Sequence, residues 1–344
     1  MQQGVSVIIC CFNSSARLPE TLRYLAWQQV PAHIPWEIII IDNASTDDTA
    51  AVAKSLWAQY NLAGIEFKVV AQPQSGLSHA REKGIATATY AYLLFCDDDN
   101  WLFSNYIALA YERMSADAMI GVLGGCGTFE PELPSWSEVE KYKTSYVNGP
   151  QYWADTHHWV YGAGSVYRKS VLEQLKNHNW KQITTGRTAK KLLAGEDIEL
   201  CFMFYLMGYK IVFDERLKFK HFVPLKRQNL QYIIKLNFGH SYTNVLLNGY
   251  YFILNKDDRR LQTVLNNWLI GATKTLLKSA LLFLFQKIKL NNGPSADQQI
   301  SFNSHFGTFC ALLKNRKKIA AQNQHVKQLL PLLQLTSPHH STID

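Results

Sequence analysis

Residues 90–101 read YAYLLFCDDDNW, and the rest of the chain is organised around this stretch. Its first half is apolar or aromatic at nearly every position, which is typical of a strand buried on both faces. The run ends in three carboxylates, Asp97, Asp98 and Asp99. Open α/β sheets bind ligands beyond the carboxyl ends of their strands, so these side chains are well placed for a metal ion that carries a polyphosphate. A solvated acidic turn or a helix cap would also explain them.

Strands and helices alternate before this stretch. Three apolar runs, at residues 5–12, 36–41 and 67–71, read as further strands, and a segment with helical features follows each of them. This alternation predicts an α/β fold with a mainly parallel, doubly wound sheet that is flanked by helices.

Composition narrows the class of protein. The 344 residues are 47% hydrophobic, which is enough for a large core and excludes a disordered chain. The net charge of +8 favours an anionic partner without choosing among phospholipid, nucleic acid and phosphorylated substrate. The six cysteines form no CxxC pair, and the N-terminus has no basic segment or cleavage site. We therefore expect reduced thiols, no export signal and a cytoplasmic location.

A second pair of carboxylates, Glu196 and Asp197, follows Gly195 at the predicted start of a helix. A carboxylate at a helix N-terminus that points into the crevice could act as a base toward a hydroxyl, although it could also only complement the helix dipole. The glycines of YGAGSVY, at residues 161–167, predict a close approach to a ligand or another backbone. We expect the basic stretch 181–191 to be exposed.

Several motifs occur together in one order over about the first 225 residues. With them the chain resembles the inverting glycosyltransferases of family 2, which have a GT-A fold. The motifs are SVIICCFN (6–13), EIIIIDNASTDDT (37–49), QSGLSHAREKGI (74–85), LLFCDDDNW (93–101), YGAGSVYRKSVL (161–172) and GEDIELCFMFYLMGYKIVFDE (195–215), followed by His221.

This resemblance implies roles for single residues. Asp97, Asp99 and His221 would hold a divalent cation, Mn²⁺ or Mg²⁺, which neutralises the leaving group of a nucleotide-sugar donor. Asp197 would be the base, and Glu196 would position the base or the acceptor. The other residues that we assign to donor binding lie in the same motifs: Cys11, Asn13, Asp42, Gly76, Arg81, Asp97 and Asp98.

The acceptor side rests on a different stretch, ADTHHWVYG at residues 154–162. Adjacent histidines point to opposite faces of a strand, so His157 and His158 are poorly spaced to bind one metal together. We interpret Trp153, His158 and Trp159 as residues that contact the acceptor.

The resemblance also divides the chain. We expect a GT-A catalytic domain over residues 1–225, with a nucleotide-sugar half at about 1–100 and an acceptor half at about 101–225. Residues 226–344 would form a helical region whose tail frays from about residue 320.

Residues 264–285 of this region combine an apolar face with a face that carries Lys274 and Lys278. Lysines in the middle argue against a spanning helix, and an in-plane helix on a membrane surface, with Lys287 and Lys289 beyond it, fits better. A helix docked on its own domain is the alternative.

The sequence thus predicts a metal-dependent, inverting glycosyltransferase that moves a sugar from a nucleotide diphosphate to a saccharide or lipid-linked saccharide acceptor, in cell-surface polysaccharide or glycolipid assembly. A catalytically inactive sugar-nucleotide-binding or scaffold protein is the alternative. A dinucleotide-dependent oxidoreductase would need GxGxxG after the first strand, where this chain has CFNSSA. We expect no nucleic acid partner, because the lysines do not gather around a recognisable module.

Overall fold

The computed structural model describes residues 1–134, 137–187, 192–289 and 293–334. The strands are β1 (Gln2–Cys11), β2 (Trp36–Asp42), β3 (Glu66–Ala71), β4 (Tyr90–Phe95), β5 (Asn100–Leu102), β6 (Ile120–Pro131), β7 (Val166–Arg168) and β8 (Lys210–Val223). The helices are α1 (Leu18–Ala26), α2 (Thr49–Tyr60), α3 (Leu77–Thr87), α4 (Tyr106–Ala116), α5 (Ser137–Lys141), α6 (Ala154–His157), α7 (Lys169–Asn177), α8 (Glu196–Leu206), α9 (Leu230–Leu246), α10 (Asn248–Leu254), α11 (Leu261–Lys289) and α12 (Ala296–Gln334).

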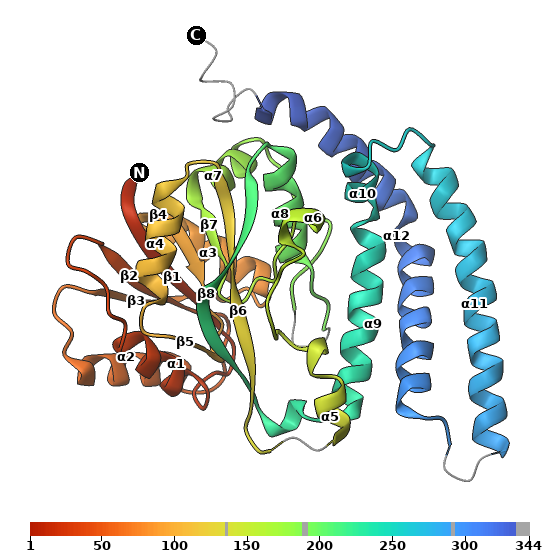
Figure 1. Cartoon of the computed structure of the whole chain (residues 1–344), viewed down its shortest axis with the longest axis horizontal. Coiled ribbons are helices and arrows are strands. Elements are labelled where there is room, and N and C mark those ends of the chain that lie inside the picture. The colour runs from red at the N-terminus through yellow and green to blue at the C-terminus, as the bar shows by residue number, and fades with distance from the viewer. Residues whose placement is uncertain (135–136, 188–191, 290–292, 335–344) are drawn as a thin grey trace.

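One eight-stranded sheet, in the order β3-β2-β1-β4-β7-β6-β8-β5, forms the centre of the protein (Figure 1). The strands β3, β2, β1 and β4 are parallel, as the alternation of strands and helices predicts. Beyond β4 the sheet is mixed, because β7 is antiparallel to both β4 and β6, and β5 is antiparallel to β8. The predicted α/β fold is confirmed, and only the β3-β2-β1-β4 part of the sheet is uniformly parallel.

Helices cover both faces of the sheet. Along β1, Val7 and Ile9 pack with residues of α1, α2 and α4, while Ile8 faces the opposite side and packs with residues of α3, α7 and α8. This alternation explains why β1, β2 and β4 are apolar on both faces. The carboxyl ends of the parallel strands stay uncovered by these helices, which leaves that edge available for a site.

From Leu230 onward all described elements are helices, and most of them pack on the sheet domain. In Figure 1, α9 and α12 stand beside the sheet, and α11 lies outside them. Tyr250 of α10 and Ile319 of α12 belong to the same core cluster as Phe202 of α8. The expected fraying from about residue 320 is wrong, because α12 continues to Gln334 and buries apolar side chains on the way. Residues 335–344 lie outside the described part.

The helix α11 keeps much of its apolar surface in solvent. Ile270, Leu277, Leu281 and Leu284 are all more than half exposed. Residues 261–286 of this helix are long and apolar enough to cross a membrane by length and composition, and only 6% of the most apolar window is buried. The side chains of residues 287–289 lie outside the described part.

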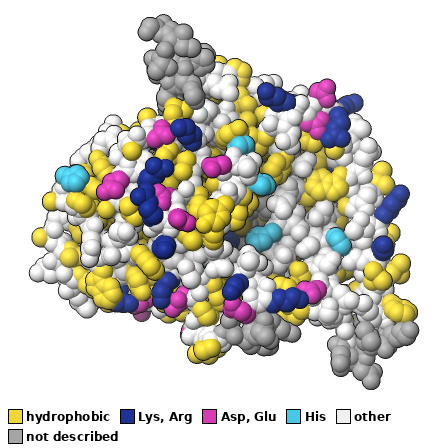
Figure 2. All heavy atoms as spheres, viewed as in Figure 1, with side chains coloured by type: hydrophobic (Ala, Val, Ile, Leu, Met, Phe, Trp, Pro, Cys, Tyr) yellow, Lys and Arg dark blue, Asp and Glu magenta, His cyan; other side chains and the backbone are white. Residues whose placement is uncertain are grey.

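Charges are mixed over the surface. On the face shown in Figure 2, lysine and arginine side chains lie among aspartate and glutamate side chains and form no continuous basic stripe. This face therefore has no basic stripe of the kind that follows a nucleic acid backbone.

Candidate active site

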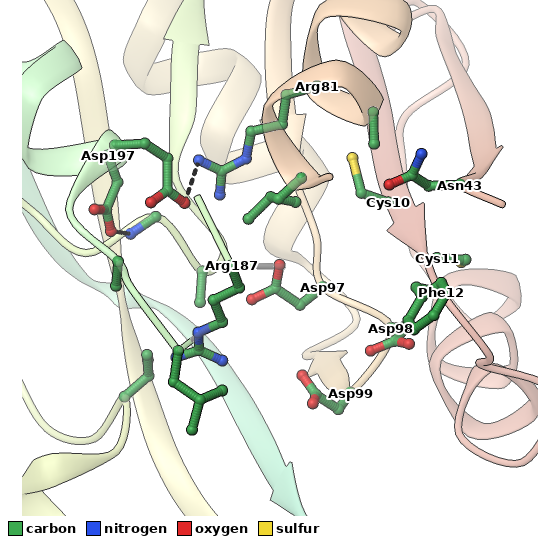
Figure 3. A pocket seen from close by; sticks show the side chains of 18 of the residues that line it. Cys10, Cys11, Phe12, Asn43, Arg81, Asp97, Asp98, Asp99, Arg187 and Asp197 are labelled. Carbon is green, nitrogen blue, oxygen red and sulfur yellow. Dashed lines mark hydrogen bonds and ion pairs between the residues drawn. The ribbon is translucent and has the colours of Figure 1, made fainter. Parts of the chain in front are cut away.

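A cavity of about 300 Å³ opens where β1, β2 and β4 end and α8 begins (Figure 3). It lies at the edge of the sheet where doubly wound folds bind their ligands. Its walls carry five carboxylates and four arginines, namely Asp97, Asp98, Asp99, Glu196, Asp197, Arg17, Arg81, Arg187 and Arg227. Nearly balanced charges of this density suit a ligand that brings both phosphates and a cation.

Asp98 fixes the loop between β1 and α1. Its Oδ2 atom accepts hydrogen bonds from the Ser14 hydroxyl and the Arg17 guanidinium. Its backbone carbonyl accepts a third from the Thr21 hydroxyl at 2.9 Å. The middle carboxylate of the cluster is thus already neutralised by an arginine and joined to the β1–α1 loop.

Asp99 lies beside His221 because β5 and β8 are paired with Asn100 opposite His221. The Nε2 atom of His221 is 3.8 Å from Asp99 Oδ1, and Arg227 Nη1 is 2.8 Å from Asp99 Oδ2. The other ring nitrogen, Nδ1, lies 3.3 Å from the Val147 carbonyl, which can only accept, so Nδ1 carries the proton of the neutral ring. Burial lowers the pKa of His221, which favours that neutral ring. Its Nε2 lone pair is therefore available to a ligand.

The residue types on this wall are those that bind a divalent cation. Asp97 and Asp99 offer carboxylate oxygens and His221 an imidazole nitrogen, and all three residues line the cavity. Burial, and after it the charge of Asp99, raises the pKa of Asp97 to about 6. An added positive charge would relieve this repulsion. Among the residues that the structure describes, no three His, Cys, Asp or Glu side chains are grouped closely enough to form a metal site by themselves.

The second carboxylate pair faces the same cavity from the start of α8. Arg81 Nη1 is 3.0 Å from Glu196 Oε1, and Asp197 Oδ2 accepts a hydrogen bond from the Gly162 backbone N–H at 2.6 Å (Figure 3). A Cβ atom on Gly162 would lie 3.0 Å from Asp197 Cβ. The glycines of residues 161–167 thus do permit a close approach, but the neighbour of Gly162 is the Asp197 side chain and not the ligand or backbone that the sequence predicted.

Most of the predicted donor residues meet at the cavity. Those that line it are Cys11, Gly76, Arg81, Asp97 and Asp98. Asn43, which is not among the predicted donor residues, also lines it and accepts a hydrogen bond from the Gly76 N–H at 2.8 Å.

Two predicted donor residues, Asn13 and Asp42, do not line the cavity. Asn13 Oδ1 accepts a hydrogen bond from Thr46 N at 2.8 Å, so its amide joins two loops at the sheet edge. Asp42 Oδ1 is buried without a hydrogen-bond partner in the described part of the chain. An unmet acceptor next to the cavity residue Asn43 fits a hydrogen bond to a ligand.

The predicted acceptor residues are not brought to this cavity. The rings of Trp153 and Trp159 pack on each other with centroids 5.2 Å apart, and Trp159 also packs on the core. His158 has a left-handed backbone (φ 58°) and stacks on Tyr205 of α8, with centroids 3.6 Å apart. His158, directly after the short helix α6, therefore lies at the C-terminal end of α8 and not at its Asp197 end.

The comparison with known proteins bears on this geometry. Residues 6–176 match the family model for glycosyl transferase family 2. The chain belongs to this family. The matched segment runs from β1 to the end of α7 and contains the Asp97–Asp99 cluster. Glu196, Asp197 and His221 lie beyond it.

Two curated relatives of this family 2 chain are glycosyltransferases. It is 33% identical over 113 residues to the cholesterol galactosyltransferase of Borreliella burgdorferi, and this match covers 33% of this chain and 30% of that protein. It is 21% identical over 218 residues to the poly-beta-1,6-N-acetyl-D-glucosamine synthase of Staphylococcus epidermidis, and this match covers 62% of this chain and 48% of that protein. The match thus spans less than half the length of either relative.

A solved structure shows the same fold. It is the mannosyltransferase PcManGT from Pyrobaculum calidifontis in complex with GDP-Man and Mn²⁺, with a TM-score of 0.51 and 15% identity. The similarity covers 100% of this chain and 79% of that one. At this identity it supports the GT-A fold of the family 2 domain, which agrees with the fold that the sequence predicts.

Several residues of the cavity lie outside the family 2 motifs that the sequence displays, among them Arg17, Arg187, Arg227 and Tyr232. Arg187 falls in the stretch 181–191, which we expected to be exposed. That expectation is wrong for its first part, because Ile183 and Thr184 are buried and Arg187 reaches the cavity. The apolar Ile183 within this basic stretch was the available signal.

Proposed function

We propose that this chain is a metal-dependent, inverting glycosyltransferase that transfers a sugar from a nucleotide-diphosphate donor to an acceptor hydroxyl. The observation that carries the proposal is that two carboxylate groups face one cavity from different elements. Asp97 and Asp99 follow β4, and Glu196 and Asp197 begin α8. Direct displacement with inversion needs this separation, since the base and the leaving group act on opposite faces of the sugar.

Asp97, Asp99 and His221 would hold the cation, Mn²⁺ or Mg²⁺. When bound, it neutralises the charge that develops on the leaving diphosphate. Asp42, with its unmet buried acceptor, supports a hydrogen bond to the base or ribose of the donor. Cys11 and Gly76 line the same side and would contact the nucleotide.

Asp197 is the proposed base. Its Oδ2 is held by the Gly162 N–H, and its Oδ1 accepts from the Ile198 N–H at 2.9 Å. Two backbone donors orient the carboxylate while further lone pairs remain for the acceptor hydroxyl. As the hydroxyl oxygen bonds to the anomeric carbon, the bond from that carbon to the diphosphate oxygen breaks with its electron pair. The hydroxyl proton passes to Asp197.

Glu196 and Arg81 support this wall from behind. Both side chains are largely buried, with 7% and 11% exposure, and they form an ion pair. Glu196 would thereby keep the Arg81 guanidinium fixed between the two carboxylate groups, where it can reach a donor phosphate.

The acceptor class is proposed from the relatives and from α11. Relatives named for sterol and polysaccharide glycosylation favour a saccharide or lipid acceptor in cell-surface polysaccharide or glycolipid assembly. Arg316 Nε of α12 is 2.9 Å from Asn266 Oδ1 of α11, so a spanning α11 would draw a basic helix into the bilayer. We therefore propose a cytoplasmic enzyme with α11 lying on the inner membrane surface.

A thermal-shift panel of nucleotide-diphosphate sugars, each with Mn²⁺, with Mg²⁺ and with EDTA, tests the proposal. A ligand that binds only the folded state raises the melting temperature. The expected result is a cation-dependent rise for one donor, followed by release of its nucleoside diphosphate when a saccharide acceptor is added. Binding without any release for every acceptor class would favour the inactive sugar-nucleotide-binding alternative.

A further inference from the structure

Glu199 is a buried carboxylate that belongs to neither of the two carboxylate groups that face the cavity. It lies one turn after Glu196 on α8 and is fully buried. Its Oε1 accepts from Ile183 N (2.8 Å) and the Tyr250 hydroxyl (2.6 Å). Its Oε2 accepts from Thr184 N (2.8 Å) and the Thr184 hydroxyl (2.5 Å). One carboxylate therefore joins α8, the segment at residues 183–184 and helix α10.

The C-terminal helices hold the same segment from outside. Gln322 Nε2 of α12 donates to the Lys181 carbonyl at 2.8 Å and to the Tyr250 hydroxyl at 3.1 Å. Lys318 Nζ donates to the Ile183 carbonyl at 3.3 Å. The segment is thus fixed between the catalytic domain and the helical region.

This segment delivers Arg187 to the cavity. The backbone carbonyl of Arg187 accepts from Leu77 N at 3.4 Å, at the start of α3 on the donor side. A Cβ atom on Gly186 would lie 3.0 Å from the Leu77 side chain, so the segment packs closely there. Figure 3 shows Arg187 between Asp97 and the Asp197 wall.

Arg187 differs from the other arginines of the cavity. Arg17 pairs with Asp98, Arg81 with Glu196 and Arg227 with Asp99. Arg187 has no ion pair among the described residues. A guanidinium without a carboxylate at ion-pair distance keeps its N–H donors available to an anion, and phosphate is the anion that its planar fork matches.

We propose that Arg187 binds the donor diphosphate and that Glu199 is a positioning residue, which holds segment 181–187 between α8 and the C-terminal helices so that Arg187 reaches the cavity. This inference rests on the proposed function, since it names a further contact to the same donor. The helical region then contributes to the site, because α10 and α12 help to hold segment 181–187 in place.

Glu199→Gln is the informative change because a carboxylate can accept at both oxygens and an amide cannot. Whichever way the amide turns, its NH₂ group meets the N–H of Ile183 or of Thr184. The segment should then lose one anchor while α8 keeps its shape. Thr184→Val removes a single hydroxyl donor and provides a milder change on the segment side.

The test is isothermal titration with inorganic pyrophosphate in the presence of Mg²⁺. Arg187→Ala should weaken binding about tenfold to a hundredfold, the usual range for a hydrogen bond to a charged group. Glu199→Gln should weaken it in the wild-type background and have little further effect in the Arg187→Ala background, because residues that act through one another are not additive. Thr184→Val should weaken it less, and it carries the test if Glu199→Gln does not fold.

Arg259→Ala, at an exposed arginine of the helical region, is the matched control and should bind like the wild type. If the wild type binds pyrophosphate and Arg187→Ala binds equally well, this inference is overturned and the proposed function stands. If the effects of Glu199→Gln and Arg187→Ala simply add, Glu199 does not act through Arg187. Absence of binding by the wild type would overturn the inference and the proposed function together.

Discussion

Replacing Arg81 by methionine should destabilise the protein strongly. The Arg81–Glu196 pair is largely buried, and the second oxygen of Glu196, Oε2, has no partner within the described residues. Methionine keeps much of the side-chain volume and removes the charge, so Glu196 is left buried without its cation. Breaking a buried pair in this way costs about 3–5 kcal/mol.

The effect should depend on pH. Burial raises the pKa of Glu196 above its ordinary value of 4.5, and Arg81 acts against this rise. Without Arg81 the folded-state pKa increases further, so the folded protein binds the proton more tightly than the unfolded chain does. Stability then falls as the pH rises above about 4.5. The deficit of the variant should be small near pH 4.5 and large at pH 7–8.

Urea unfolding of the ligand-free protein at several pH values measures this. The pair Arg23–Glu20 on α1, whose side chains are 33% and 36% exposed, provides the control, and Arg23→Met should cost at most about 1 kcal/mol at any of these pH values. A double variant, Arg81→Met with Glu196→Gln, should recover part of the lost stability because no charge remains buried. If Arg81→Met were as stable as Arg23→Met at pH 8, the buried ion pair would not exist in solution.

Three other changes test separate parts of the site and surface. Asp197→Asn should keep donor binding and lose transfer by about two to four orders of magnitude, and near wild-type turnover would exclude it as the base. Gly162→Ala should displace the Asp197 carboxylate and lower kcat about a hundredfold with little change in donor affinity, whereas an equal rise in KM would place the effect in donor binding. Lys274→Gln with Lys278→Gln should reduce flotation with anionic vesicles far more than with neutral ones and only at low salt. Equal, negligible flotation of both proteins would mean that α11 does not rest on lipid.

The part of the fold from β1 to β4 could be predicted because its signals are local. The parallel strands are mainly apolar, and in β4 the apolar run is followed almost directly by polar residues, the Asp97–Asp99 cluster. A close contact at Gly162 could also be predicted, because pairs of glycines are typical of close contacts. The sequence did not predict that the neighbour is Asp197.

The remaining features depend on contacts between distant segments. The sequence predicts that Arg187 lies in an exposed basic stretch, because the residues that hold this stretch in place are distant in the chain. Glu199, which binds Thr184, is twelve residues beyond Arg187, and Lys318, which binds Ile183, lies in α12. Trp153 and Trp159 appeared suited to an acceptor, but aromatic side chains fill cores as readily as they bind sugars, and here they pack on each other. The sequence did not predict that α12 continues to Gln334, because the apolar residues of this mostly polar helix occupy only a narrow face.

Cation-dependent binding of the donor found in the thermal-shift panel is the most direct test of the proposed site. Isothermal titration would compare the wild type, Asp99→Ala and Asp197→Asn, each with Mn²⁺ and with EDTA. We expect the wild type and Asp197→Asn to bind the donor with Mn²⁺ and to lose affinity in EDTA, while Asp99→Ala folds normally and binds weakly in both. If Asp99→Ala bound the donor with wild-type affinity in Mn²⁺, the carboxylates at the end of β4 would not hold the cation.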